Sequence, residues 1–468
     1  MRGQGIILCN GKRRWLLSSA VLVCAFGAAL LLGATLGGNA AGASAPRAAL
    51  FRVAPLLTRV SPPRGPRAGV SRVSLSAGVP TPGTTSRLIE VSCTSASRCF
   101  AVGSYENSAG ATLNGLLRWN GGKWSLVSVP QPAGTANGDT NSLNAVTCTS
   151  ASSCWAVGQE QQAPSPPAIP ALLNEVLRWN GKHWSAFSVP QPAGTGDGAQ
   201  NQLFGVACAG AGDCWATGLQ GTENSSRNQA LHWNGRKWQY VSTPHPGTQS
   251  LLERDTCASV SDCWAAGFAI KGANQAGPEI NQLLHWNGKK WSEAVVPQPA
   301  GTSPRDGQLL AGVSCTSSRD CWATGAYVPY EPKAPKGQPA ALNQALHWNG
   351  KKWSQAVTPE PAGTAKKDFN GLLDVSCVSV SKCFAAGFTG TATGDPMNQV
   401  LRWNGKRWSA ASVPQPAGTT PQDVGRPGLY GISCVSASDC WAVGTTHLGS
   451  NPFLNQVLRL HGNHWSRS

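Results

Sequence analysis

The stretch "CTSASSCWAVG", Cys148 to Gly158, decides the fold, because the chain repeats it in slightly altered form seven times. In each copy five residues separate two cysteines, and Trp or Phe directly follows the second cysteine. Successive copies begin 49 to 62 residues apart. A period of that size indicates an array of supersecondary units that stack on one another.

Each repeat contains four short apolar segments. In the second repeat they are Leu143–Cys148, Cys154–Gly158, Asn174–Asn180 and Lys182–Pro190. Each has the length of a strand, and turn residues separate each from the next. Asn-Gly lies between the third and fourth segments in repeats one to six, and this dipeptide is a strong hairpin signal because both residues tolerate positive φ. The sequence therefore predicts a four-stranded antiparallel meander in every repeat.

The third segment is apolar on both faces, since Val400 and Leu401 in "NQVLRWN" point in opposite directions. A sheet stacked between two neighbouring sheets has this pattern. Seven such sheets close most naturally into a ring, so we expect an all-β chain with a seven-bladed β-propeller over residues 72–468. The stretch 72–84 resembles 407–419, and we expect Val73–Val79 to complete the outer strand of the last blade, which removes an open edge.

The segment "CWAVG", followed by a loop and then by "LRWNGKRWSAASVPQP", resembles a kelch-type blade. The resemblance extends from about Arg72 to Ser468, with a single glycine (Gly158 in repeat two) where the kelch pattern has a doublet. The chain is also similar to exported actinobacterial proteins built from this Cys/Trp repeat, whose function is largely unknown. The kelch resemblance implies a propeller and a habit of binding, and it implies no chemistry.

The N-terminus has the pattern of an export signal. Lys12–Arg14 precede an uncharged run over 15–36, and small residues around 41–43 fit a cleavage site. The run is also long enough to cross a bilayer, so residues 1–45 are either a cleaved signal peptide or an anchor helix. Residues 46–71 have the composition of a flexible linker. We expect a secreted or extracytoplasmic protein, with membrane anchoring through 15–36 as the open alternative.

The net charge of +16 is unevenly distributed. Residues 1–85 hold ten Lys and Arg and no Asp or Glu, which leaves +6 on the rest of the chain. The whole-chain charge therefore does not indicate nucleic-acid binding, and we expect no nucleic-acid partner.

Paired cysteines that flank a turn in an exported chain indicate a disulfide across that turn. Zinc sites favour closer spacing and need a second pair of ligands, so we expect neither a metal nor another cofactor. The expected disulfides are Cys93–Cys99, Cys148–Cys154, Cys208–Cys214, Cys257–Cys263, Cys315–Cys321, Cys377–Cys383 and Cys434–Cys440.

Three further sets of residues recur with the repeat. The tryptophans on both sides of each Asn-Gly turn are predicted to pack across the hairpin, with a sugar-stacking platform as the alternative. The asparagine that begins each third segment is predicted to bond back to the backbone. His232, His285 and His347 lie at equivalent positions in adjacent blades, too far apart to share a metal ion, so we expect partly exposed structural histidines.

Strand direction sorts the loops onto two rims. The cysteine hairpins and Asn-Gly turns share one rim, and the loops of variable length share the other, where specificity usually resides. The longest variable loop, 326–342, carries the candidate contact residues Tyr327, Tyr330 and Glu331. Glu253, Arg254 and Asp255 break the repeat, and they approach the central channel if their segment is the innermost strand.

No catalytic constellation emerges from these residues, and we expect a monomeric, non-catalytic protein that binds a protein or carbohydrate ligand at the variable-loop rim. Two alternatives stay open. One is a polysaccharide hydrolase or lyase with its site at the propeller channel, which clustered carboxylates at the channel mouth would favour. The other is a surface-display module on a membrane stalk.

Overall fold

The computed structural model describes residues 79–468, apart from 164–168, 223–224, 273–276, 305, 330–339, 367, 392–395, 416–427 and 447–452. The expected signal or anchor segment and the linker lie outside the described residues. Within the described ranges, no helix has the length and hydropathy needed to cross a membrane.

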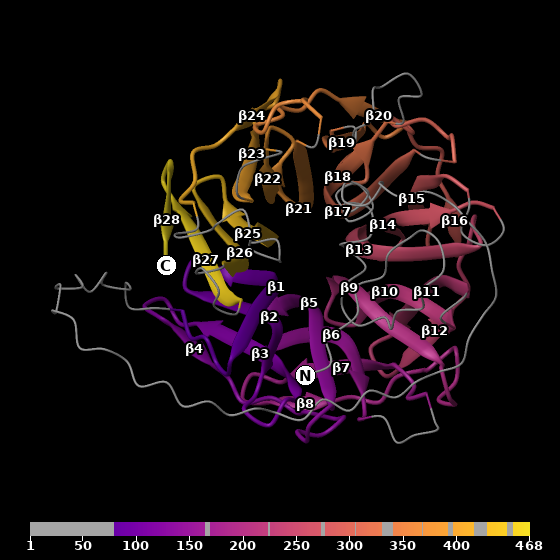
Figure 1. The fold of residues 1–468 in the computed structure, drawn as a ribbon, viewed down its shortest axis with the longest axis vertical. Helices are drawn as coiled ribbons and strands as arrows, with labels where there is room; N and C mark the ends of the chain where they lie inside the picture. The colour runs from indigo at the N-terminus through magenta and orange to yellow at the C-terminus, as the bar shows by residue number, and fades with distance from the viewer. Residues whose placement is uncertain are drawn as a thin grey trace, which may run out of the picture.

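The described residues form 28 strands in seven antiparallel blades around a central axis (Figure 1). In each blade the strand that enters from the preceding repeat lies nearest the axis, and the fourth strand lies at the periphery. Blades 1 and 2 are joined in one sheet only by the parallel bridge between Thr112 and Thr140. The all-β, seven-bladed propeller is therefore as predicted.

Blades 1 to 4 consist of β1 (Thr85–Ser95), β2 (Arg98–Glu106), β3 (Thr112–Trp119) and β4 (Trp124–Leu126); β5 (Thr140–Ser150), β6 (Ser153–Gln161), β7 (Leu173–Trp179) and β8 (Trp184–Ala186); β9 (Gln200–Gly210), β10 (Asp213–Thr222), β11 (Ser225–Trp233) and β12 (Trp238–Val241); and β13 (Gln249–Ser259), β14 (Asp262–Ile270), β15 (Glu279–Trp286) and β16 (Trp291–Glu293). Blades 5 to 7 consist of β17 (Gly307–Ser317), β18 (Asp320–Val328), β19 (Leu342–Trp348) and β20 (Trp353–Ala356); β21 (Phe369–Ser379), β22 (Lys382–Gly390), β23 (Met397–Trp403) and β24 (Trp408–Ala410); and β25 (Gly428–Ser436), β26 (Asp439–Thr446), β27 (Leu454–His461) and β28 (His464–Arg467).

All seven predicted disulfides are present, each within one repeat. The two cysteines of each pair stand directly opposite each other in the register of the first two strands, as Cys93 and Cys99 do in blade 1. A hairpin that already brings two Cβ atoms together needs little rearrangement to form the bond. Disulfides at this density are typical of a protein that folds outside the cytoplasm.

Aromatic side chains join each blade to the next. In blade 2, Trp155 follows the second cysteine, and its ring lies 4.9 Å from Trp233 and 5.2 Å from Trp238 of blade 3. Trp233 and Trp238 face each other across the Asn-Gly hairpin. These three rings are buried, so their predicted packing role is confirmed, whereas Trp286, Trp348 and Trp403 at the position of Trp233 in blades 4 to 6 are partly exposed.

The ring closes through the same contacts between blades 7 and 1. Trp441 of blade 7 lies 4.7 Å from Trp119 and 5.2 Å from Trp124 of blade 1. The backbone N–H of Cys93 donates to Ser433 Oγ at 3.1 Å, matching the bond that joins blade 6 to blade 7. The closed circle leaves no blade with an open face.

The asparagine that begins each third strand donates to a proline carbonyl that follows the outer strand, at 2.6 to 3.0 Å in all seven blades. In blade 7 this proline is Pro80, which comes from the N-terminal end. The outer strand of blade 7, however, is β28 from the C-terminus, and Val73–Gly78 lie outside the described residues. The N-terminal segment thus supplies the tail after that strand, and the prediction that Val73–Val79 completes the outer strand lies, apart from Val79, outside the described residues.

Candidate functional site

One position of every inner strand recurs at a bulge and lies against the inner strand of the next blade. This position is the third residue before the first cysteine. The residue that precedes this position has no partner in the register of the inner strand with the second strand, so the inner strand has a β-bulge there. Bulges re-aim side chains and often occur near functional sites. In blade order, the position holds Glu90, Ala145, Gly205, Arg254, Gly312, Asp374 and Gly431.

The three charged residues at this position meet across the channel. Arg254 Nε lies 2.7 Å from Glu90 Oε2, although the two residues belong to blades 4 and 1. A guanidinium Nη1 of Arg254 also donates to the carbonyl of Phe204 at 2.7 Å and to that of Glu253 at 3.0 Å. The side chain of Arg254 is thus held by polar groups from three blades.

Asp374 completes the cluster from blade 6. Its two carboxylate oxygens accept from the backbone N–H groups of Val375 and Ile432, both at 2.8 Å. It also shares a hydrogen bond with Glu90. Glu90, Arg254 and Asp374, here named the channel cluster, therefore hold blades 1, 4 and 6 together across the axis.

A glycine precedes each member of the channel cluster around the ring. A Cβ atom added to Gly431 would lie 2.8 Å from Glu90 Cα, and one added to Gly312 would lie 2.7 Å from Asp374 Cα. At Gly205 the added atom would meet Arg254 Cα at 3.0 Å. Because these distances are shorter than any ordinary Cβ contact, the blades approach closely only where the side chain is absent.

Burial raises the pKa of every carboxyl group around the channel. Burial raises the pKa of Glu90 to about 8; the nearby Asp374 carboxylate raises it further, and Arg254 lowers it. Burial raises the pKa of Asp374 to about 6. Burial raises the pKa of Glu253 to about 7 and that of Asp255 to about 8. Burial by itself lowers the pKa of Arg254, but the carboxylates around it reverse the direction, so it stays charged.

We expect the free energy of unfolding to decrease as the pH rises from about 5 to about 8.5. The pKa values of Glu253 and Asp255 in the folded chain lie above their ordinary values. At a pH between the ordinary and the raised pKa, the folded chain therefore holds protons that the unfolded chain has released. Raising the pH removes those protons and with them stability. Urea unfolding followed by tryptophan fluorescence at several pH values measures the decrease.

The matched variant for this test is Glu253→Gln, which keeps the shape of the side chain and removes its titration. Over the same pH range, the free energy of unfolding of this variant should fall by on the order of 3 kcal/mol less than that of the wild-type chain. A midpoint that rises with pH in the wild-type chain would contradict the expectation.

The innermost strand of blade 4, β13, contains Glu253, Arg254 and Asp255. The sequence predicts that these residues approach the channel if their segment is the innermost strand, and it is. Only Arg254 belongs to the channel cluster. Glu253 is 3 % exposed, and its Oε1 has no hydrogen-bond partner among the described residues. The sequence did not point to Glu90 or Asp374, although acidic residues at the same repeat position as Arg254 were a usable signal.

Tyr327 is at the end of β18, on the rim of variable loops, while Tyr330 and Glu331 lie outside the described residues. Burial raises the pKa of Tyr327, and a hydrogen bond with Gln355 of the outer strand opposes that shift. Blade 3 has the same pair with the residue types exchanged. There Gln220 occupies the position of Tyr327, and its Nε2 donates to Tyr240 Oη on the outer strand at 2.8 Å.

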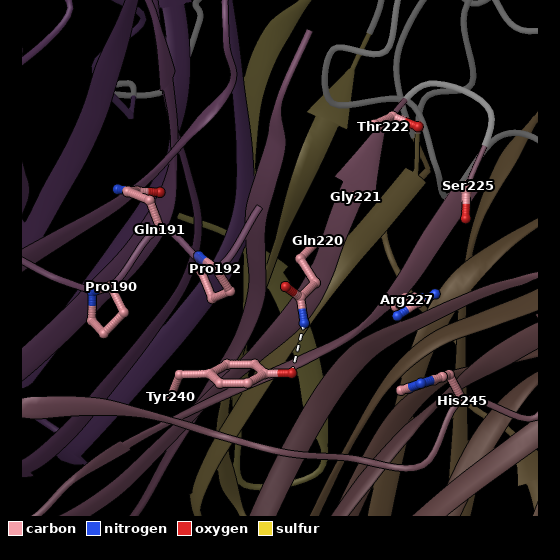
Figure 2. A pocket seen from close by; sticks show the side chains of 10 residues that line it. All are labelled: Pro190, Gln191, Pro192, Gln220, Gly221, Thr222, Ser225, Arg227, Tyr240 and His245. Carbon is pink, nitrogen blue, oxygen red and sulfur yellow. Dashed lines mark hydrogen bonds between the residues drawn. The ribbon is translucent and has the colours of Figure 1, made fainter. Parts of the chain in front are cut away.

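A groove of about 530 Å³ surrounds this pair in blade 3 (Figure 2). Tyr240 is 41 % exposed, and Gln220 points toward its hydroxyl group. Arg227 and His245 lie on the other side of the groove in Figure 2, and all of its other lining residues are Pro190, Gln191, Pro192, Gly221, Thr222 and Ser225. The site combines an exposed aromatic ring with polar groups from two neighbouring blades, and sequence reasoning missed it.

Comparisons with known proteins concern the architecture. No protein-family model matches the sequence, and no curated protein matches it. The chain is similar to the solved structure of YCF48 from Cyanidioschyzon merolae, with a TM-score of 0.40, 15% identity, and coverage of 82% of this chain and 98% of that one. It is also similar to a PL25 ulvan lyase, with a TM-score of 0.48, 11% identity, and coverage of 83% and 94%. A protein of unknown function from Dyadobacter fermentans has a TM-score of 0.43 at 12% identity, with coverage of 68% and 93%.

Proposed function

We propose that this chain is an exported, non-catalytic binding module whose ligand, an envelope glycan or a protein, contacts the variable-loop rim. The observation that carries the proposal is the groove in blade 3 with Tyr240 exposed in it. Binding pockets typically combine apolar or aromatic surface with a few convergent polar groups, and this groove has both. A tyrosine ring presents a flat apolar face together with a hydroxyl group, which suits a sugar ring as well as a peptide.

The surrounding features support a scaffold that presents a site. The disulfides, the aromatic contacts between blades and the channel cluster all stiffen the ring, and a rigid ring holds its surface loops in place. We further propose that the blades are of the kelch type, that the chain is a monomer, and that residues 1–45 direct export or anchor the chain through 15–36.

We expect Tyr240→Ala to weaken binding to the best ligand from a panel of envelope glycans and envelope proteins by about tenfold or more. The substitution removes the exposed ring and leaves the blade core intact. The matched control is Leu126→Ala, because Leu126 occupies the same position on the outer strand of blade 1 and is similarly exposed. Calorimetry with wild-type chain and both variants measures the effect. Equal affinities for wild-type and Tyr240→Ala would count against the groove, and no binding anywhere in the panel would count against the module.

A second candidate function is cleavage of a polysaccharide at the channel. It is favoured by the carboxyl groups around the channel, since pKa values of about 6 to 8 suit general acids and bases. It ranks second because these groups are buried midway along the inner strands rather than at the channel mouth, and Glu90 and Asp374 are already engaged by Arg254 and by backbone N–H groups. Depolymerisation of an acidic polysaccharide that is lost in Glu90→Gln would reverse the ranking.

A further inference from the structure

The rim opposite the groove carries a circle of exposed cations. Each Asn-Gly turn in blades 1 to 6 is followed by one or two basic residues, and no ion pair within the described residues engages them. This set, here named the basic rim, consists of Lys123, Lys182, Arg236, Lys237, Lys289, Lys290, Lys351, Lys352, Lys406 and Arg407.

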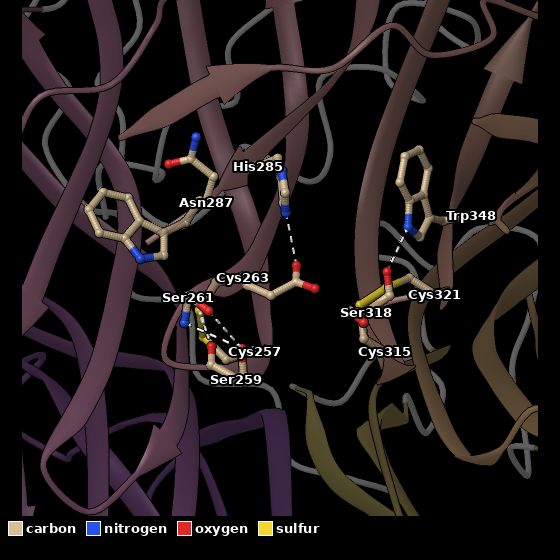
Figure 3. A network of polar contacts seen from close by, with 12 residues as sticks. Cys257, Ser259, Ser261, Cys263, His285, Asn287, Cys315, Ser318, Cys321 and Trp348 are labelled. Carbon is tan, nitrogen blue, oxygen red and sulfur yellow. Dashed lines mark hydrogen bonds and ion pairs between the residues drawn. A yellow bond between two sulfur atoms is a disulfide. The ribbon is translucent and has the colours of Figure 1, made fainter. Parts of the chain in front are cut away.

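The same turn geometry places these cations at the same level in successive blades. A tryptophan before each turn donates to a carbonyl of the cysteine hairpin, as Trp348 Nε1 does to Ser318 at 3.1 Å (Figure 3). The glycine of each turn has positive φ, and a Cβ atom on Gly288 would lie 2.9 Å from Ser261 Cβ in the hairpin. The turns and hairpins therefore form one rim on which the cations repeat at equivalent positions from blade to blade.

The acidic residues on this rim are already paired. His285 Nε2 lies 2.9 Å from Asp262 (Figure 3), and His232 and His347 have equivalent aspartate partners in blades 3 and 5. In blade 7, Arg459 pairs with Asp439 at 3.0 Å. These pairs confirm the predicted structural role of the histidines, and among the described residues no group of three candidate ligands could hold a metal ion. These four aspartates are far fewer than the ten cations of the basic rim, so this rim keeps a net positive charge.

The described residues of the opposite rim carry a net negative charge. Its described cations, in loops or near the adjoining strand ends, include Arg227, Lys271, Lys366 and Arg467, whose guanidinium donates to the carbonyl of Gln415. Its described loop acids are more numerous, and they are Glu106, Asp139, Glu160, Asp197, Glu279, Asp306, Glu360 and Asp368. Counted over the described residues, the disc is therefore positive on one face and negative on the other, which orients it in the field of a charged partner.

Two apolar side chains project among the cations. Val260 and Val380 occupy the tips of the cysteine hairpins in blades 4 and 6, and they are 58 % and 62 % exposed. An anionic polymer in water gains nothing from valines at the contact. A bilayer surface gains from both groups, because basic residues meet lipid phosphates while small apolar residues enter the interfacial layer.

We propose that the basic rim docks on an anionic phospholipid bilayer and holds the variable-loop rim away from the membrane. A circle of cations at equivalent positions can contact a planar surface in several blades at once, whereas a linear polyanion follows only part of the circle. The proposal is independent of the groove, since the two lie on opposite faces of the ring.

The test is co-sedimentation of the full chain with vesicles of phosphatidylcholine and of phosphatidylcholine mixed with phosphatidylglycerol. Residues 1–85 carry ten cations of their own, so the comparison is made between variants that share this segment. We expect Lys289→Glu with Lys290→Glu to lower the preference for the anionic vesicles by roughly 30-fold or more at low salt, since two cations are lost and two repelled carboxylates are added. Lys271→Glu with Lys366→Glu makes the same change of charge on the opposite rim and should lower the preference far less.

Val260→Asn with Val380→Asn tests the bilayer against a polymer without any change of charge. We expect weaker binding to the anionic vesicles and unchanged binding to dextran sulfate. Equal losses in the two lysine variants, equal binding to both kinds of vesicle, or an unchanged vesicle affinity in the valine variant would each overturn the proposal. If the valine variant kept its vesicle affinity and the wild-type chain bound dextran sulfate more tightly than the anionic vesicles, the basic rim would be assigned to a polyanion instead.

Discussion

Reduction of the seven disulfides is expected to unfold the propeller under conditions in which the oxidised chain is fully folded. Each bridge closes a loop with a sequence separation of six residues, for which chain entropy gives roughly 2 kcal/mol. Seven such contributions together are comparable with the whole free energy of unfolding of an ordinary protein. Near-ultraviolet circular dichroism is a direct measurement, because the signals of the packed tryptophans disappear when the blades separate.

A single missing bridge provides the graded control. Cys148→Ser with Cys154→Ser should lower the free energy of unfolding by about 2 kcal/mol while the ring stays closed. The effect should be local because each bridge lies within one blade, and repeat arrays respond approximately as sums of blade and interface contributions. If the fully reduced chain unfolded at the same urea concentration as the oxidised chain, the bridges would be incidental to stability.

The fold could be predicted from the sequence because its determinants are local and recur. Cysteine pairs, Asn-Gly turns and tryptophans each specify one hairpin, and these signals appear in nearly every repeat. The number of blades follows from counting. The end of the ring was harder to predict, because the similarity of 72–84 to 407–419 identified the segment whose Pro80 accepts from Asn455 of blade 7, while the described outer strand β28 comes from the C-terminus.

The channel cluster could be predicted only in part. Arg254 stood out because charge replaced a small residue, but its partners are 164 residues before it and 120 residues after it. Contacts between blades 1, 4 and 6 exist only once the ring has closed, and the bulge that aims these side chains leaves no mark of its own in the sequence. The groove was missed for a related reason, since its lining combines the tail of one repeat with the second to fourth strands of the next.

Arg254→Met is expected to destabilise the folded chain by about 3–5 kcal/mol above about pH 8.5, where both Glu90 and Asp374 are ionised in the wild-type chain. The substitution keeps most of the volume of the side chain and removes its charge, which leaves Glu90 and Asp374 buried without their counter-charge. Urea unfolding measures the loss. Arg236→Met, at an exposed turn position of the basic rim, is the control and should change stability by less than about 0.5 kcal/mol.

Two further measurements separate the loss of charge pairing from a simple loss of packing. If unpaired carboxylates cause the loss in Arg254→Met, lowering the pH to about 5 should recover much of it, because burial without Arg254 raises the pKa of Glu90 further and both groups take up protons more readily. Adding Glu90→Gln and Asp374→Asn to Arg254→Met should also restore stability, since a buried cluster of ions replaced as a whole by neutral groups costs little. A stability loss caused by a packing cavity would change neither with pH nor with these two substitutions. If the loss of unfolding free energy stayed the same in both experiments, Arg254 would contribute through packing and not as the charge that holds three blades together.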